Sequence, residues 1–330
     1  MAGNITSVNF SGGFKKLNGT VALTATRADI IRSLLTVGYP SRRAAVRVVG
    51  RWRERMLVAM ATGYLDNALN TTLYFRNLEQ SEKVGVSFLL GEAFTHWYAQ
   101  DRMKIEYLVH VGGLSSCTWT SPTTPLTPKT GASLPAAKSR PDFIGIRRTE
   151  SHVFESKGRI RRPAASAVSK ALGQVSALHS VNGKAPKTRC ASFFMLRSAG
   201  TEGFVSDPPV DGKGSGVNFD VLDALAKAYS FFLDEPTTDL PADVSDGYVG
   251  REIEGGVYFG LDKKVFAAIQ ERPDGEQERR RRTAEIFAII ADRSQSYEGR
   301  RERNVSAGPD GTILIDRRSR PGSRQRVIAK

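Results

Sequence analysis

The 330-residue sequence predicts an α/β fold in which helices cover a mixed sheet. Between residues 81 and 198 the candidate elements follow one another as helix, strand, strand, strand, helix and strand. A short run of neighbouring strands followed by a helix-connected strand is typical of a mixed sheet. The apolar fraction of 40% and the charged fraction of 25% are those of an ordinary globular protein, so disorder is not expected for most of the chain.

The amino-terminal part of the chain is expected to be helical and basic. Residues 20–78 contain helix-like segments, and in one of them Val46, Val49, Arg53 and Met56 recur three or four positions apart. The same segment carries a dense set of arginines: Arg42, Arg43, Arg47, Arg51, Arg53 and Arg55. Such a helix can lie on phosphates, and a solvated outer face explains the pattern about as well.

Residues 81–111 are predicted to supply the first helix and strand of the sheet region. The segment 81–100 has the pattern of a largely buried helix that begins at Ser81. Ile105, Tyr107 and Val109 then alternate as in a strand. The stretch 112–140 is rich in Ser, Thr, Pro and Gly, which predicts a long loop, disordered in preference to functional.

The next residues supply the remaining strands of the predicted sheet. PDFIGI and HVFESKG are short apolar runs separated by a charged turn, residues 164–179 have a helical pattern, and CASFFMLRS favours a strand. We also expect an amphipathic helix over 217–235, and a strand followed by a helix over 255–269. The arginine run 279–282 and the basic tail 317–330 are expected to be solvated or to contact phosphates.

Charge and cysteine content limit the classes of function. Lys plus Arg number 48 and Asp plus Glu 34, and the net charge of +14 favours a polyanionic partner, although a merely soluble basic protein would show it too. Neither a signal-peptide pattern nor a run of roughly 18 apolar residues is present, so we expect a cytoplasmic protein and no membrane partner. Since Cys117 and Cys190 allow no disulfide framework or zinc cluster, oxygen atoms would have to hold any metal.

Acidic residues stand at the ends of the two predicted strands in 139–159. Because side chains alternate along a strand, Val153, Glu155 and Lys157 share one face. If the strands form a hairpin, the carboxylates of Asp142 and Glu155 converge, which creates a hard-oxygen site suited to Mg²⁺. A cation there can polarise a phosphodiester, while the Lys157 amine can orient or help deprotonate the attacking water. An ordinary surface ion pair at a strand end is the competing interpretation.

The segments SRPDFIGI and HVFESKG resemble the PD-(D/E)XK signature of the restriction-endonuclease-like nuclease superfamily, and the order of elements resembles its α-β-β-β-α-β core. The triplet also occurs at Asp211–Lys213 and Asp262–Lys264, but only 142–157 has the two strand-like runs and the flanking elements. The resemblance implies that Asp142 and Glu155 bind Mg²⁺ or Mn²⁺ and that Lys157 assists the water. It also implies a metal-binding role for Glu92 on the first core helix, although a carboxylate bonded to an arginine or to backbone would fit that position nearly as well.

Further site residues follow from the resemblance. Gln174 and Lys170, on the helix after the triplet, resemble the polar residues that many members carry there, with Lys170 the better candidate for phosphate contact. An exposed helix face is the alternative for at least one of them. The turn containing Arg159, Arg161 and Arg162 is expected to contact the nucleic-acid backbone, and a solvated turn is equally consistent with the sequence.

The resemblance covers roughly residues 81–198. We expect a nuclease core over residues 79–235, between a basic helical extension at 1–78 and a basic, partly flexible extension at 236–330. The expected activity is metal-dependent hydrolysis of phosphodiester bonds, in DNA rather than RNA, in bacterial restriction or phage defence. Because family members often act as dimers, a homodimer or a partner subunit is also expected. Two other functions stay open: a catalytically inactive nucleic-acid-binding module of the same fold, and a protein whose basic faces bind an acidic partner protein.

Overall fold

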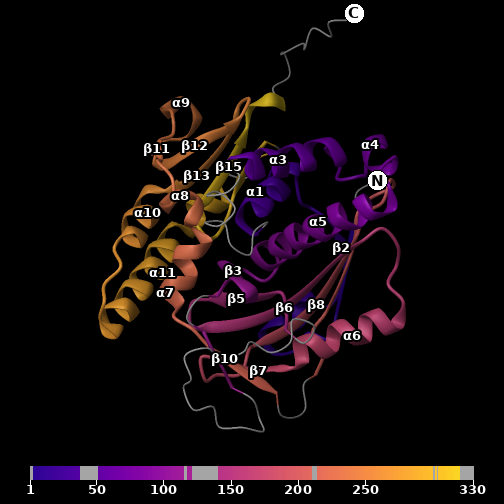
Figure 1. Ribbon diagram of the computed structural model, residues 1–330, viewed down its shortest axis with the longest axis horizontal. Coiled ribbons are helices and arrows are strands. Elements are labelled where there is room, and N and C mark those ends of the chain that lie inside the picture. Colours follow the sequence, from indigo (N-terminus) through magenta and orange to yellow (C-terminus); the bar gives the residue numbers. More distant parts are fainter. Residues whose placement is uncertain are drawn as a thin grey trace, which may run out of the picture.

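The computed structural model describes residues 3–37, 51–114, 117–120, 140–209, 214–299, 302 and 304–319 (Figure 1). Several predicted features lie outside these residues: Arg42, Arg43 and Arg47, most of the loop expected at 112–140, the triplet Asp211–Lys213, and the basic tail after residue 319.

A seven-stranded mixed sheet forms the centre of the described structure. Its strands are ordered β2-β1-β9-β8-β6-β5-β3. β3, β5 and β6 form an antiparallel meander, and β6 pairs with β8 in parallel, which requires a crossover connection between them. The mixed sheet flanked by helices is as predicted. The strands are β1 (Asn4–Val8), β2 (Gly19–Ala22), β3 (Tyr107–His110), β5 (Phe143–Arg147), β6 (Glu150–Arg159), β8 (Thr188–Met195) and β9 (Glu202–Ser206).

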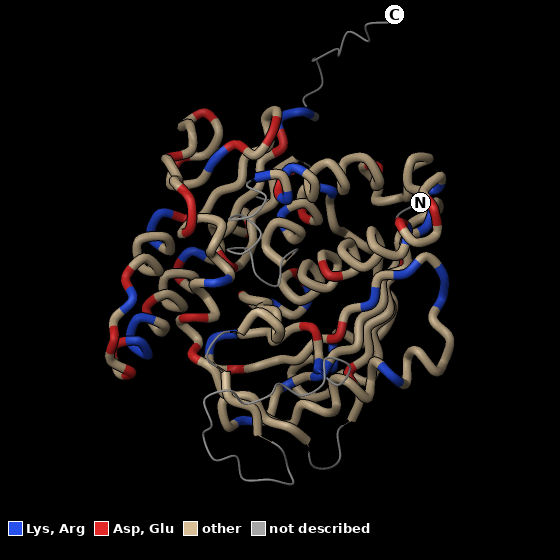
Figure 2. The backbone as a smooth tube through the Cα atoms, in the orientation of Figure 1, with Lys and Arg blue, Asp and Glu red and all other residues tan. Residues whose placement is uncertain are grey.

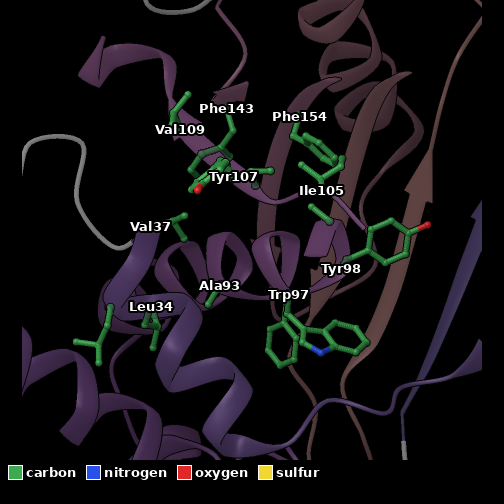
Figure 3. Close-up of a cluster of buried hydrophobic side chains, with 14 of the residues drawn as sticks. Leu34, Val37, Ala93, Trp97, Tyr98, Ile105, Tyr107, Val109, Phe143 and Phe154 are labelled. Carbon is green, nitrogen blue, oxygen red and sulfur yellow. The ribbon is translucent and has the colours of Figure 1, made fainter. Parts of the chain in front are cut away.

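Helix α5 (Gln80–Asp101) is the central helix of the fold. It packs on β6 and β8 and is covered in turn by α1 (Arg27–Val37), so that every residue from Gly91 to Gln100 is buried. A helix enclosed on all sides needs apolar residues on more than one face, and Ala93, Trp97 and Tyr98 supply them here (Figure 3). The Thr95 hydroxyl donates to Ser156 at 2.9 Å and so ties α5 to the middle of the sheet.

Helix α6 (Ala165–Ser176) provides the crossover between β6 and β8 and lies on the other side of the sheet from α5 (Figure 1). Its buried residues, Ala171 and Val175, are four positions apart and therefore share one helix face. The helix ends earlier than the predicted residue 179, because Leu178 begins a strand of a small sheet of order β4-β10-β7. These strands are β4 (Thr118–Thr120), β7 (Leu178–Val181) and β10 (Ser215–Asn218).

The carboxy-terminal part of the chain forms a third sheet, of order β11-β12-β13-β15-β14, with helices against it. The strand and helix predicted over 255–269 are confirmed as β13 and α10. The strands are β11 (Thr238–Asp239), β12 (Tyr248–Glu254), β13 (Val257–Asp262), β14 (Val305–Ala307) and β15 (Thr312–Asp316). The helices are α7 (Val221–Ala228), α8 (Ser230–Leu233), α9 (Ala242–Ser245), α10 (Lys263–Gln270) and α11 (Glu276–Glu298).

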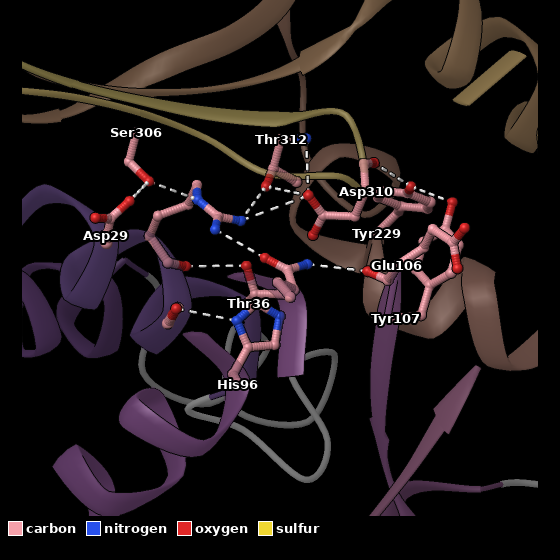
Figure 4. Close-up of polar contacts among 12 residues, drawn as sticks. Asp29, Thr36, His96, Glu106, Tyr107, Tyr229, Ser306, Asp310 and Thr312 are labelled. Carbon is pink, nitrogen blue, oxygen red and sulfur yellow. Dashed lines mark hydrogen bonds and ion pairs between the residues drawn. The ribbon is translucent and has the colours of Figure 1, made fainter. Parts of the chain in front are cut away.

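A buried arginine joins the third sheet to the central helices. Arg32 of α1 is 1% exposed, and its guanidinium donates to Ser306 at 2.8 Å and to Thr312 at 3.1 Å. It also donates to Gln100 of α5 at 2.7 Å and pairs with Asp310 at 3.5 Å (Figure 4). A buried cation is tolerated only when it is paired and hydrogen-bonded, and here residues from two other parts of the chain, α5 and the segment 306–312, meet that need.

Two predictions about the amino-terminal half are wrong. The segment 1–78 is not purely helical, because β1 and β2 belong to the seven-stranded sheet, with Ile5 of β1 paired in parallel with Gly203 of β9. Helix α5 does not begin at Ser81: Glu79 is its N-cap, and the Glu82 carboxylate accepts from the Glu79 N–H at 2.9 Å in a capping box. The remaining helices of this segment are α3 (Trp52–Tyr64) and α4 (Leu73–Arg76).

The arginine run 279–282 is part of a folded helix rather than a free basic arm. In α11, Arg279 pairs with Asp220 at 2.8 Å, and the three arginines that follow it each pair with a glutamate: Arg280 with Glu276, Arg281 with Glu278, and Arg282 with Glu285. Red and blue segments accordingly alternate along this helix in Figure 2. The run therefore contributes little unpaired positive charge.

Candidate active site

The hairpin of β5 and β6 brings the two predicted carboxylates to one end of the strand pair. Phe143 pairs with Phe154, so Asp142, one residue earlier, comes opposite Glu155, one residue later. The Ser156 N–H donates to Oδ2 of Asp142 at 2.8 Å and fixes that carboxylate against β6. The convergence expected from strand alternation is therefore present in the structure.

Lys157 completes a compact cluster with these carboxylates. Its ammonium group donates to Oε1 of Glu155 and lies 4.0 Å from Oδ2 of Asp142. The Glu155 side chain is fully buried, whereas the side chains of Asp142 and Lys157 are 25% and 28% exposed. The cluster thus opens to solvent through Asp142 and Lys157, and Glu155 forms its floor.

Burial and mutual repulsion perturb the two carboxyl groups. Burial and, second, repulsion from the neighbouring Asp142 raise the pKa of Glu155 to about 7, although the Lys157 ammonium opposes both effects. Burial also raises the pKa of Asp142, again opposed by Lys157. Ionisation of both carboxyl groups at this distance is unfavourable, because the two negative charges repel each other, unless a further cation binds between them. A divalent cation would relieve that cost.

Glu92 approaches the same cluster from α5. It is 4% exposed, and burial raises its pKa to about 8, with repulsion from Asp142 as the second cause and attraction to Arg53 and Lys157 opposing them. The position of Glu92 depends on close packing of α5 against the backbone of β6. A Cβ placed on Gly158 of β6 would lie 1.5 Å from the carbonyl oxygen of Ser87 on α5. Glycine at 158 therefore lets α5 sit directly on the residue after Lys157.

The donor set fits a hard divalent cation held by two carboxylates. Oε2 of Glu155 is buried and has no hydrogen-bond partner, so it is free to accept a ligand. Mg²⁺ commonly uses one or two protein carboxylates and completes its shell with water and substrate phosphate. Among the described residues, no group of three or more His, Cys, Asp and Glu side chains is arranged to hold a metal ion. The metal-binding role expected for Glu92 stays a prediction.

The residues predicted on α6 are not brought into this cluster. Gln174 donates to the backbone carbonyl of Arg140 at 3.4 Å, a long contact that lies two residues before Asp142. Lys170 is exposed on the outer face of the helix. Gln174 thus lies near the cluster but contacts main chain, and Lys170 is available to solvent.

Basic residues line the strand ends beside the cluster. Because β6 and β8 are parallel, their last residues reach the same edge of the sheet, where Arg159 pairs in register with Met195. Arg159 is half-buried, and its Nε has no hydrogen-bond partner. Arg161 is exposed, and Arg162 lies 3.8 Å from Glu202 with 79% of its side chain exposed. Figure 2 shows this edge as a blue stretch after β6.

Two further arginines belong to this region and were not singled out by the sequence as site residues. Nη1 of Arg140 is buried without a hydrogen-bond partner, two residues before Asp142. Arg53 of α3 is an electrostatic partner of Glu92. The arginine immediately before Pro141 was visible in the motif itself, whereas the approach of α3 to α5 depends on tertiary packing.

The remaining described triplet, Asp262–Lys264, has a structural role. Asp262 ends β13, and its Oδ1 accepts from the Lys264 N–H at 2.9 Å as the N-cap of α10. Its other oxygen pairs with Arg293 of α11. This carboxylate is thus committed to a helix cap and an ion pair.

Comparison with known proteins yields no match to a family model, a curated protein or a solved structure. Among the described helices, none has the length and apolarity needed to cross a bilayer.

Proposed function

We propose that this chain is a metal-dependent phosphodiesterase. The observation that carries the proposal is the cluster of Asp142, Glu155 and Lys157, in which two carboxylates and an amine meet beside a buried, unpartnered carboxylate oxygen. An ordinary ion pair would need only one carboxylate, and buried carboxylate oxygens in purely structural pairs are usually hydrogen-bonded.

The more particular proposal is a nuclease of the PD-(D/E)XK type that acts on DNA. The elements α5, β3, β5, β6, α6 and β8 support it, because they resemble the family's arrangement of helix, meander, crossover helix and parallel strand, with β4 and β7 of the small sheet inserted between them. DNA as the substrate and a role in restriction or phage defence follow from the resemblance alone. The basic strand edge at Arg159–Arg162 supports a polyanionic substrate.

Each residue has a defined task in the proposed reaction. Asp142 and Glu155 present oxygen atoms on one side of the opening, and a bound divalent ion would supply positive charge to the phosphate in the transition state. The Lys157 ammonium group, partly exposed beside them, would orient the attacking water by donating a hydrogen bond to its oxygen, and its charge would stabilise the negative charge that develops at the phosphate. Arg159 holds a neighbouring phosphate so that the scissile bond faces the cluster.

A catalytically inactive binding module of the same fold is the second candidate. The observation in its favour is that the Lys157 amine is engaged by Glu155, while the described part of the chain contains no group of three metal-binding side chains. The two candidates differ in cleavage and agree in binding.

Cleavage assays separate these candidates. Supercoiled plasmid, linear DNA and RNA are incubated with purified protein in Mg²⁺, Mn²⁺ or EDTA, beside Asp142→Asn and Lys157→Ala. We expect metal-dependent nicking that falls by about 100-fold or more in either variant. Lys264→Ala is a matched control because it removes an exposed lysine from the same type of triplet. Equal nicking by all proteins would refute the assignment, whereas binding without cleavage by any of them would favour the inactive module.

A further inference from the structure

Helices α3, α4 and the first half of α5 carry an unusual set of exposed apolar side chains. Among the described residues, the exposed large hydrophobic side chains all fall between positions 52 and 88: Trp52, Met56, Leu73, Tyr74, Val84 and Phe88. Trp52 is 72% exposed and Tyr74 77%. Apolar side chains gathered in this way mark a binding surface.

The outer face of α3 combines an aromatic ring with positive charge. Trp52, Arg55 and Met56 are exposed and lie three or four positions apart, on one face of the helix. The Arg55 guanidinium lies 5.8 Å from the centre of the Trp52 ring. Glu54, the one acidic residue of α3, is buried and pairs with Arg251 at 3.1 Å. The outward face is therefore cationic and aromatic, with no exposed acid.

Exposed apolar side chains on α5 continue this surface towards the candidate active site. Val84, Phe88 and Glu92 are spaced by four residues along α5, so the exposed Val84 and Phe88 lie on the face that carries Glu92. Arg53, at the start of α3, is an electrostatic partner of the same Glu92.

The short helix α4 lies between the other two. It contacts the end of α3 through Tyr64 and Phe75, whose rings are 6.1 Å apart, and leads into α5 after three residues. Figure 1 shows α3, α4 and α5 together on one side of the seven-stranded sheet.

We propose that this helical surface binds the unpaired nucleotides of a single nucleic-acid strand that runs towards Glu92 and Lys157. Exposed aromatic rings offer stacking platforms for bases, and interleaved arginines pair with phosphates. A duplex hides the faces of its bases, so it cannot use Trp52, Tyr74 and Phe88 in this way. The charge complementarity of the α3 face to phosphate favours this occupant over an apolar protein segment. That the bound strand runs towards Glu92 and Lys157 rests on the proposed nuclease function. That the surface binds a single strand does not depend on it.

Tryptophan fluorescence can test this surface directly. Trp97 and Trp119 are 1% and 4% exposed, so Trp52 is the accessible tryptophan among the described residues. In EDTA, a thymidine oligonucleotide should quench Trp52 in the full chain, and a blunt duplex of equal length should quench it much less. Anisotropy of a labelled oligonucleotide should show about tenfold weaker binding for Trp52→Ala and for Phe88→Ala. Trp52→Phe keeps a stacking ring and should bind nearly as wild type, as should Arg280→Ala, which removes an exposed arginine from α11.

Three results would overturn the proposal: no quenching, equal affinity of wild type and Trp52→Ala, or equal or tighter binding of the duplex. Sedimentation that shows a wild-type dimer and a monomeric Trp52→Ala variant would also overturn it, because a second copy of the chain would then cover the surface. The binding measurements need no metal and no cleavage. If Trp52→Ala loses affinity for the single strand and the wild type shows no nuclease activity, the proposed function is refuted and this inference is supported.

Discussion

Replacing Glu92 by glutamine removes the charge of a buried carboxyl group with little change of shape. Burial raises the pKa of this group from its ordinary value of 4.5 to about 8. Between these values the folded protein holds a proton that the unfolded chain releases, so the stability of the wild type falls as the pH rises. Below pH 4.5 the group is protonated in both states, and the substitution should have little effect.

The pKa shift sets the size of the effect. Each pKa unit corresponds to about 1.4 kcal/mol, so the ionisable group costs at most about 3 kcal/mol at pH 7 and about 5 kcal/mol above pH 8. Because glutamine must still satisfy a buried amide, we expect Glu92→Gln to raise the free energy of unfolding at pH 8 by about 1 to 3 kcal/mol. The gain should nearly vanish at pH 5. Added Mg²⁺ should reduce the difference in the free energy of unfolding between Glu92→Gln and the wild type, because it relieves the repulsion among Glu92, Asp142 and Glu155.

Urea unfolding at pH 5, 7 and 8, with and without Mg²⁺, measures this difference. Glu298→Gln, which neutralises an exposed glutamate on α11, is the control and should show no such pH dependence. If Glu92→Gln is no more stable than wild type at pH 8, Glu92 is ionised and compensated in the folded protein. The electrostatic description of the site would then be wrong.

Three other outcomes are expected. Metal-dependent cleavage should rise with pH by up to roughly tenfold per unit below pH 7, because metal binding needs ionised carboxylates and the pKa of Glu155 is raised to about 7; a flat pH–rate profile between 5.5 and 7 would contradict this. Gly158→Ala should destabilise the fold by about 1 to 3 kcal/mol or more in urea, because its Cβ would meet the Ser87 carbonyl oxygen, whereas Gly173→Ala on the open face of α6 should be neutral or stabilising by up to about 1 kcal/mol. Arg32→Met should cost about 3 to 5 kcal/mol by leaving buried polar partners such as Asp310 unpaired, and a loss below about 1 kcal/mol would show that those partners find other bonds.

Local sequence patterns sufficed where the determining contacts were local. The alternation of HVFESKG and the charged turn before it predict a hairpin, and the pairing of Phe143 with Phe154 places Asp142 opposite Glu155 as expected. The crossover helix and the parallel strand after it could be predicted for the same reason, since each has its own periodicity.

Other features depended on residues far apart in the chain. Strand β1 pairs with β9 through Ile5 and Gly203, and no property of NITSV alone indicates that partner. From the sequence, the side chain of Gln174 could have contacted either the carboxylates or the backbone. The packing of α6 on the sheet places it at the backbone carbonyl of Arg140. The charge of the run 279–282 was visible, but the pairing of Arg279 with Asp220, at the start of another helix, was not.

The buried guanidinium of Arg32 also limits which segments of this protein can be removed or exchanged. Because α5 and the β14–β15 hairpin both supply partners to the buried charge of α1, removal of either one would leave part of that charge without a hydrogen-bond partner. Truncation to the segment 79–235 should therefore yield an insoluble fragment rather than a minimal enzyme. The amino- and carboxy-terminal segments should therefore be exchanged between engineered proteins only together with the central sheet, unlike appended modules that can be moved separately.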